Sequence, residues 1–121
     1  MKHKVLIIDD IKATRETIRE MLERGGYDVL EAAHGKAGLK LLREHEPAVV
    51  VTDILMPEME GLETIRTLRK SKPHLPIVAI TAATDTPYLQ LALKFGAVCG
   101  LYKPFKQSEL LYSIEKILQP R

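Results

Sequence analysis

Four charged side chains stand where they could together hold a divalent cation and a phosphoryl group. Each comes at the end of a short apolar run of the sequence: Asp9, Asp10, Asp53 and Lys103. A β-branched run without polar interruption, such as residues 48–52 before Asp53, is typical of a central parallel strand. Open α/β sheets bind their ligands at the carboxyl ends of such strands. The sequence therefore predicts that three acids and one lysine meet at one edge of a sheet.

The residue types suit this chemistry. Mg²⁺ is a hard cation that binds oxygen ligands, usually one or two carboxylates together with phosphate. Phosphoryl transfer depends on positioning and on cations that absorb charge on the phosphoryl oxygens, and a carboxylate can itself be the nucleophile. Three clustered carboxylates repel one another, which is expected to raise the pKa of the acids in a metal-free site. Lys103 and Mg²⁺ would relieve that repulsion.

Strands and helices alternate along the whole chain without a linker. Strands are predicted at 4–8, 27–31, 48–52, 76–80 and 98–102, and helices at about 12–24, 35–45, 61–71 and 107–118. The remaining helix, fourth in chain order, is predicted to have Thr86 as its N-cap and Pro87 in its first position. Strict alternation implies an α/β fold. We expect one domain, 1–121, with a doubly wound, five-stranded parallel sheet of flavodoxin-like order 2-1-3-4-5 and five helices on both faces.

Composition and charge exclude several classes of protein. The 121 residues suffice for one domain with a substantial core, and the net charge of +2 does not favour nucleic acid as a direct partner. No apolar run approaches the ~20 residues needed to span a membrane, so membrane insertion is not expected. The N-terminal segment is too short for a signal peptide. The single cysteine, Cys99, excludes an internal disulfide framework, and a cytoplasmic location is expected.

Four short motifs, each placed after a predicted strand, identify a family. The chain resembles, over essentially its whole length, the receiver domain of two-component response regulators, and it is closest in size to the single-domain chemotaxis type. Any one of the motifs would be weak evidence, but all four occur in the right order. They are Asp9-Asp10, Asp53-x-x-Met56-Pro57-x-Met59-x-Gly61, Thr81-Ala82 and Lys103-Pro104-Phe105.

The resemblance implies a role for each of these positions. Asp53 would be the phosphoacceptor, and Mg²⁺ would be held by Asp10 directly, by Asp9 largely through water, and by Asp53 and the backbone carbonyl of Leu55. Thr81 would hydrogen-bond a phosphoryl oxygen, and Lys103 would pair with Asp53 and then with the phosphoryl group. The Lys103–Pro104 peptide would be cis, while Pro57 and Gly61 would shape the loop after the phosphoacceptor. The positions are read from the motifs quoted above.

The resemblance also implies the function. The domain would accept a phosphoryl group from a histidine kinase or a histidine phosphotransfer protein in a Mg²⁺-dependent reaction. It would signal through protein contacts of the face formed by the fourth helix, fifth strand and fifth helix, since no DNA-binding segment follows within the sequence. It would not be an enzyme acting on other substrates, but would catalyse its own phosphorylation and slow dephosphorylation. Leu55 and Ala83 occupy the two positions that tune that lifetime, and neither can orient a water.

Three other functions remain as alternatives. A receiver-like scaffold would signal without phosphorylation, but the complete set of acids, threonine and lysine argues against it. A phosphate-ester hydrolase using the same nucleophile would need an acid/base Asp at position 55, where Leu55 stands. A flavin-binding module of the same topology would need a Ser/Thr/Gly-rich phosphate loop, whereas the loop after the first strand is acidic. The chain could also be a receiver cut from a larger regulator or hybrid kinase.

Two features depart from the family pattern. An aromatic residue usually stands three positions before the lysine and reports the phosphorylation state, but here that position is Gly100. Tyr102 lies on the same face of the strand by alternation, and we expect it to replace part of that function. The alternative is that the phosphorylation state is transmitted without an aromatic residue. The fourth helix is apolar on more than one side. It could contact both the sheet and the fifth helix, or it could form part of a homodimer or partner surface.

Overall fold

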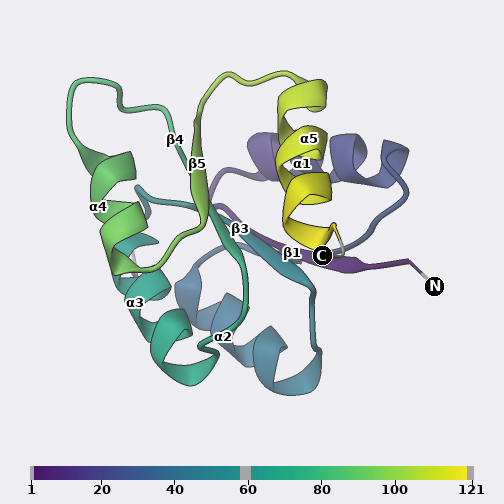
Figure 1. The fold of residues 1–121 in the computed structure, drawn as a ribbon, viewed down its shortest axis with the longest axis horizontal. Coiled ribbons are helices and arrows are strands. Elements are labelled where there is room, and N and C mark those ends of the chain that lie inside the picture. Colours follow the sequence, from purple (N-terminus) through teal and green to yellow (C-terminus); the bar gives the residue numbers. More distant parts are fainter. Residues whose placement is uncertain (1, 58–60, 120–121) are drawn as a thin grey trace.

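The computed structural model describes residues 2–57 and 61–119 of the chain. Within them five strands alternate with five helices (Figure 1). The strands are β1 (Lys4–Ile8), β2 (Asp28–Ala32), β3 (Val49–Asp53), β4 (Ile77–Thr81) and β5 (Cys99–Tyr102). The helices are α1 (Lys12–Arg24), α2 (Gly35–Glu44), α3 (Gly61–Ser71), α4 (Tyr88–Phe95) and α5 (Gln107–Leu118). Strands β2 to β5 each begin one residue later than predicted.

The five strands form one parallel sheet in the order β2-β1-β3-β4-β5, which confirms the predicted topology. Helices α1 and α5 cover one face, and α2, α3 and α4 cover the other (Figure 1). Alternate side chains of the central strands enter two separate apolar cores, because both faces of the sheet are covered. Residues such as Val5, Ile7, Ile18 and Leu110 line one core, and Leu6, Ile8, Ile65 and Leu89 line the other.

The register of the strands brings the predicted site residues to one edge. Ile8 lies opposite Thr52, so Asp9 leaves β1 beside the position where Asp53 ends β3. On the other side, Asp53 lies opposite Ile80 in β4. The last pair in β4 and β5 is Thr81 and Tyr102, directly before Lys103. All these residues therefore meet at the carboxyl edge of the sheet, where open α/β sheets bind ligands.

Helix α4 differs from the sequence-based expectation in two ways. Pro87 occupies the N-cap and the helix begins at Tyr88, so the assignment of Thr86 as N-cap was wrong by one residue. The Thr86 hydroxyl does not cap the helix; it is buried and has no hydrogen-bond partner among the described residues. The helix packs on α3, β4 and β5, so its helical neighbour is α3 rather than the expected fifth helix. Helices α4 and α5 lie on opposite faces of the sheet, which explains the difference (Figure 1).

Most of the apolar side chains of α4 are buried or half-buried inside the fold. Leu89 and Ala92 are buried, and Tyr88 and Phe95 are half-buried against the α2–α3–α4 core. Leu93 is the exception, with 47% of its surface exposed. No helix within residues 2–57 and 61–119 has the length and apolarity required to cross a membrane.

Candidate functional site

Three carboxylates converge at the carboxyl edge of the sheet. One oxygen each from Asp9, Asp10 and Asp53 lies within 4.8 Å of the others. Asp9 is fully buried and Asp53 is 4% exposed, whereas Asp10 is exposed. The two buried acids form the floor of the cluster and Asp10 forms its rim. A ligand from solution therefore meets Asp10 first and the carboxylate of Asp53 below it.

Lys103 joins the two buried acids. Its Nζ donates to Asp9 Oδ2 and to Asp53 Oδ2, both at 3.0 Å. The Lys103–Pro104 peptide is cis, as the sequence resemblance implied. One ammonium thus offsets part of the charge of two carboxylates that solvent reaches poorly. Such compensation is required because a buried carboxylate without a partner is costly.

The electrostatics of the cluster follow from its burial. Burial raises the pKa of Asp53, and the nearby charge of Asp9 adds to the increase. The hydrogen bond and charge of Lys103 oppose that increase without cancelling it. For Lys103, burial alone would lower the pKa, but hydrogen bonds to Asp9 and Asp53 raise it above its ordinary value. The lysine therefore stays charged at neutral pH, and the predicted strain on the acids is present at Asp53.

Backbone N–H groups hold three of the site side chains. Ile11 donates to Asp9 Oδ1 at 2.9 Å, and Leu55 donates to Asp53 Oδ1 at 3.2 Å. In the loop after β4, the backbone N–H of Ala83 donates to the Thr81 hydroxyl at 3.1 Å. Each bond spans two residues, the pattern by which Asp and Thr side chains order a turn. The strand ends thus orient their own functional groups.

Asp10 directly precedes α1, where an aspartate often caps a helix, but it does not act as a cap here. The N-cap of α1 is Ile11, and no side chain caps it. The oxygen donors at this edge also suit Mg²⁺, because three carboxylates offer hard oxygen ligands and Asp10 is open to water. Among residues 2–57 and 61–119 no hydrogen bond to the carbonyl of Leu55 is present, and its place among the ligands remains a prediction. Met59 of the third motif lies outside the described residues.

Gly100 leaves room that another residue fills. A Cβ added there would lie 2.8 Å from Leu89 Cδ2 and 3.1 Å from Cδ1. Leu89 of α4 therefore fills the space directly beside Gly100. Tyr102, two residues further along β5, is 41% exposed, and its role as a replacement stays a prediction. Pro57 is exposed in the loop after β3, whereas Gly61 is buried at the start of α3.

Sequence reasoning missed two residues beside the site. Arg15 of α1 donates through Nη1 to the backbone carbonyl of Asp9 at 2.8 Å, and through Nε to Glu31 at 3.1 Å. Glu31 also pairs with Arg19. A signal was present in the sequence, because Arg15 follows Asp10 by little more than one helical turn. The alternation of side chains along β2 did not indicate that Glu31 would pair with Arg15.

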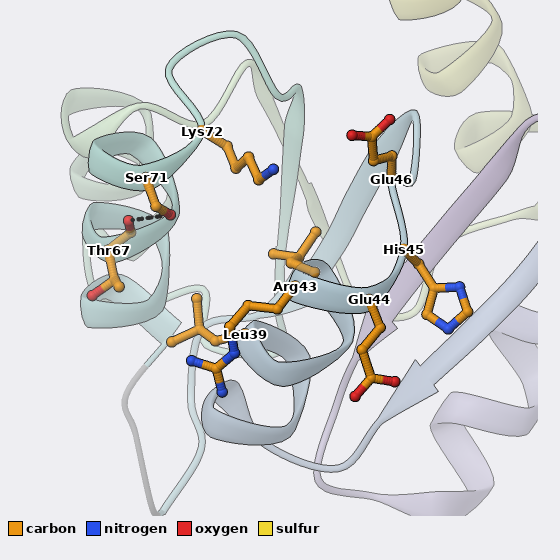
Figure 2. Close-up of a pocket in the computed structure, with 9 residues that line it drawn as sticks. Leu39, Arg43, Glu44, His45, Glu46, Thr67, Ser71 and Lys72 are labelled. Atoms are coloured by element: carbon orange, nitrogen blue, oxygen red, sulfur yellow. Dashed lines mark hydrogen bonds between the residues drawn. The ribbon is translucent and has the colours of Figure 1, made fainter.

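Two hollows of the surface differ in their relation to this site. One of about 470 Å³ lies between α1 and the loop after β5, lined by Thr14, Ile18, Lys103 and Phe105 among others. The other, of about 560 Å³, lies between α2 and α3 at the opposite edge of the sheet (Figure 2). Its lining includes Arg43, Glu44, His45, Glu46 and Lys72, and Ser71 Oγ donates to the Thr67 carbonyl. Only the first hollow adjoins the acid cluster.

Comparison with known proteins gives a consistent result. The family model described as the response regulator receiver domain matches residues 5–115. Response regulator MprA of Mycolicibacterium vanbaalenii is 37% identical over 119 residues, which are 98% of this chain and 52% of that protein. The alkaline phosphatase synthesis transcriptional regulatory protein PhoP of Bacillus subtilis is 33% identical over 98% of this chain and 50% of its own length. The chain thus spans about half the length of these curated relatives.

Solved structures agree with the fold. Chemotaxis protein CheY4 of Vibrio cholerae superimposes with a TM-score of 0.90 at 30% identity, covering 98% of this chain and 100% of that chain. A putative response regulator from Chloroflexus aurantiacus has a TM-score of 0.94 at 30% identity, covering 99% and 100%.

Proposed function

The chain belongs to the response regulator receiver domain family, and from this premise we propose that it is a phosphorylation-driven signalling switch with Asp53 as phosphoacceptor. One observation carries the proposal. Asp53 is 4% exposed, its carboxylate accepts a hydrogen bond from the Lys103 ammonium at 3.0 Å, and it lies in a cluster with two further acids. A buried acid held between one cation and two other acids is suited to phosphoryl transfer.

The reaction follows from the contacts of Asp53. A carboxylate oxygen of Asp53 forms a P–O bond to the phosphorus of a phosphohistidine, and the P–N bond breaks as the imidazole leaves with its electron pair. Lys103, already 3.0 Å from Oδ2, then neutralises charge on the transferred group. The Thr81 hydroxyl, at the end of the adjacent strand β4, would donate a hydrogen bond to a phosphoryl oxygen in this scheme. Mg²⁺, held by Asp9, Asp10, Asp53 and the Leu55 carbonyl, would stabilise the charge that develops on the phosphoryl oxygens.

Incubation with acetyl phosphate and Mg²⁺ is expected to add one phosphoryl group to the protein. The adduct should be absent in Asp53→Asn, because an amide is not a comparable nucleophile, and absent with EDTA. Intact mass measures both. Asp28→Asn, an exposed aspartate at the start of β2, is the matched control and should be modified like the parent chain. An absence of adduct under every condition would favour the phosphorylation-independent scaffold.

The phosphoryl donor is proposed to be a histidine kinase or a histidine phosphotransfer protein. It would dock on the hollow between α1 and the Pro104–Phe105 segment, because Lys103 lines that hollow and its Nζ contacts Asp53 Oδ2 at 3.0 Å. The apolar side chains of Ile18 and Phe105 offer a contact surface there. A cytoplasmic location is part of this proposal and is supported by the single, half-buried Cys99.

Output is proposed to run through protein contacts of the α4–β5–α5 face, including a possible homodimer. Exposed large apolar side chains on these elements and the turn between them support this role: Leu93, Val98, Tyr102 and Tyr112. Direct contact of the receiver with nucleic acid is not part of the proposal.

The aspartyl phosphate is expected to persist for minutes or longer. Hydrolysis needs a water aligned with the P–O bond, and neither Leu55 nor Ala83 has a group that could orient one. Decay of the purified adduct in Mg²⁺, followed by intact mass, tests this. Ala83→Gln should shorten the lifetime, while Leu55→Val should leave it nearly unchanged. Loss of the adduct within seconds in the parent chain would contradict the prediction.

A further inference from the structure

Arg15 hydrogen-bonds the backbone of Asp9, where the Asp9-Asp10 pair follows the end of β1. Its Nη1 donates to the Asp9 carbonyl at 2.8 Å, and its side chain is only 16% exposed. The other polar groups of Asp9 are also engaged. The N–H donates to the Ala32 carbonyl, Oδ1 accepts from Ile11, and Oδ2 accepts from Lys103. The peptide that joins Asp9 to Asp10 is therefore oriented by Arg15 through its carbonyl.

Asp10 depends on that peptide for its position. Its carboxylate is exposed, and no hydrogen bond or ion pair within residues 2–57 and 61–119 holds it, although it lies within 4.8 Å of the other acids. The direction of the Asp10 side chain therefore depends on the orientation of the Asp9–Asp10 peptide. Rotation of the Asp9–Asp10 peptide would swing this carboxylate away from the two buried acids.

Arg15 is itself held in place from the far side. Its Nε donates to Glu31 Oε1 at 3.1 Å, and Arg19 donates to the other oxygen of the same carboxylate. Burial tends to raise the pKa of Glu31, but the hydrogen bonds from Arg19 and Arg15 lower it below its ordinary value. Glu31 is thus ionised at neutral pH and fixes the guanidinium of Arg15 toward Asp9.

We propose that Arg15 is a positioning residue of the cation site, which fixes the Asp9–Asp10 peptide so that the Asp10 carboxylate is presented to a divalent cation. The inference rests on the proposed function, because it assigns the cation site to the same acid cluster. Residues that orient metal ligands from behind typically contribute about 10–100-fold to metal affinity.

Arg19 supplies a matched control. It lies one turn further along α1 and shares Glu31, but the structure gives it no contact with Asp9. Arg19→Met and Arg15→Met therefore remove the same positive charge and the same kind of ion pair to Glu31. Only Arg15→Met also releases the Asp9 carbonyl. Loss of a positive charge near three acids would by itself strengthen cation binding, so a weaker affinity in Arg15→Met has the opposite sign to a pure charge effect.

The test is calorimetric titration of the full chain with MgCl₂ alone, so no phosphoryl chemistry enters the measurement. Arg15→Met is expected to weaken Mg²⁺ binding by about tenfold, within the usual range for such residues. Arg19→Met should leave the affinity unchanged or slightly stronger, and Arg15→Lys should recover part of the loss because it keeps one donor. Thermal unfolding in EDTA accompanies each titration, and Arg15→Gln is the second variant if Arg15→Met does not fold.

Three results would overturn the proposal. One is an unchanged or stronger Mg²⁺ affinity in Arg15→Met and Arg15→Gln. Another is an equal loss in the Arg15 and Arg19 variants, which would reduce the role of Arg15 to support of α1. The third is the absence of Mg²⁺ binding in the parent chain. Asp10→Asn, which removes a proposed ligand, shows how much affinity is lost when that ligand is absent. Failure of phosphorylation at Asp53 alone would leave these outcomes interpretable, because Mg²⁺ binding is measured without a phosphoryl donor.

Discussion

Lys103→Met is expected to destabilise the metal-free protein by about 2–3 kcal/mol at pH 7. The substitution leaves the carboxylates of Asp9 and Asp53 buried without their shared ammonium. Removal of one partner from a buried ion pair typically costs roughly 3–5 kcal/mol, and we place this case lower because the exposed Asp10 opens the site to water. Urea unfolding in EDTA measures the difference. The same variant should form the phosphoryl adduct poorly, since Lys103 would no longer neutralise the transferred group.

The stability lost in Lys103→Met should depend on pH in one direction. The pKa of Asp53 is raised by burial, so the folded protein holds this proton more tightly than the unfolded chain. Its contribution to stability is therefore greatest in acid and falls as pH rises through the raised pKa. Lys103 has a raised pKa, and its contribution is fully present below the ordinary lysine value. Removing Lys103 should therefore cost less at pH 5 than at pH 7, because a larger fraction of Asp53 is protonated at the lower pH.

Two further variants isolate the charge effect. Lys40→Met removes an exposed lysine of α2 and should change stability little. Adding Asp53→Asn to Lys103→Met removes one of the two buried carboxylates that lack a counter-charge, and it should restore part of the lost stability. Mg²⁺ should stabilise Lys103→Met more than the parent chain, because the ammonium that pairs with the carboxylates of Asp9 and Asp53 is then absent. Equal destabilisation at pH 5 and pH 7 would contradict this electrostatic account.

Gly61→Ala is expected to destabilise the fold by about 3 kcal/mol, at the upper end of typical overpacking costs. A Cβ on Gly61 would lie 2.2 Å from the Asp53 carbonyl oxygen, 2.3 Å from Ile54 Cα and 2.6 Å from the Ile54 carbonyl oxygen. All three atoms belong to the backbone, so no side-chain rotation can relieve the contact. The end of β3 must move instead, and phosphorylation of Asp53 should slow as well. Unfolding in urea and the rate of adduct formation measure the two effects.

Gly100→Ala is the matched control for this substitution. There the new Cβ would approach the Leu89 methyl groups at 2.8 and 3.1 Å, and these belong to a flexible side chain. The expected cost is about 1 kcal/mol, at the low end of the overpacking range, with little change in adduct formation. If Gly61→Ala were tolerated as well as Gly100→Ala, the close approach of α3 to the phosphoacceptor strand would not constrain the site.

The sequence was sufficient for the fold and for the main members of the candidate site. Alternation of β-branched runs with amphipathic segments specifies a parallel sheet, because the short apolar runs form buried strands and the segments with a 3.6-residue period form the helices between them. Strand order then follows from the usual order of doubly wound parallel sheets, and the structure confirms it. Because carboxyl ends of parallel strands share an edge, Asp9, Asp53 and Lys103 had to meet there. Boundaries were less certain, as the start of α4 at Tyr88 shows.

The tertiary structure alone decided which groups touch. Burial of Asp9 beside the exposed Asp10, and the bridging of Asp9 and Asp53 by Lys103, depend on side-chain directions at three strand ends. Arg15 reaches Asp9 because the first turn of α1 lies over the end of β1, and the short spacing of the two residues becomes a contact only through that packing. Residue types and periods are local properties, which the sequence determines. Contacts between segments distant along the chain depend on how whole elements pack, and only the folded structure fixes them.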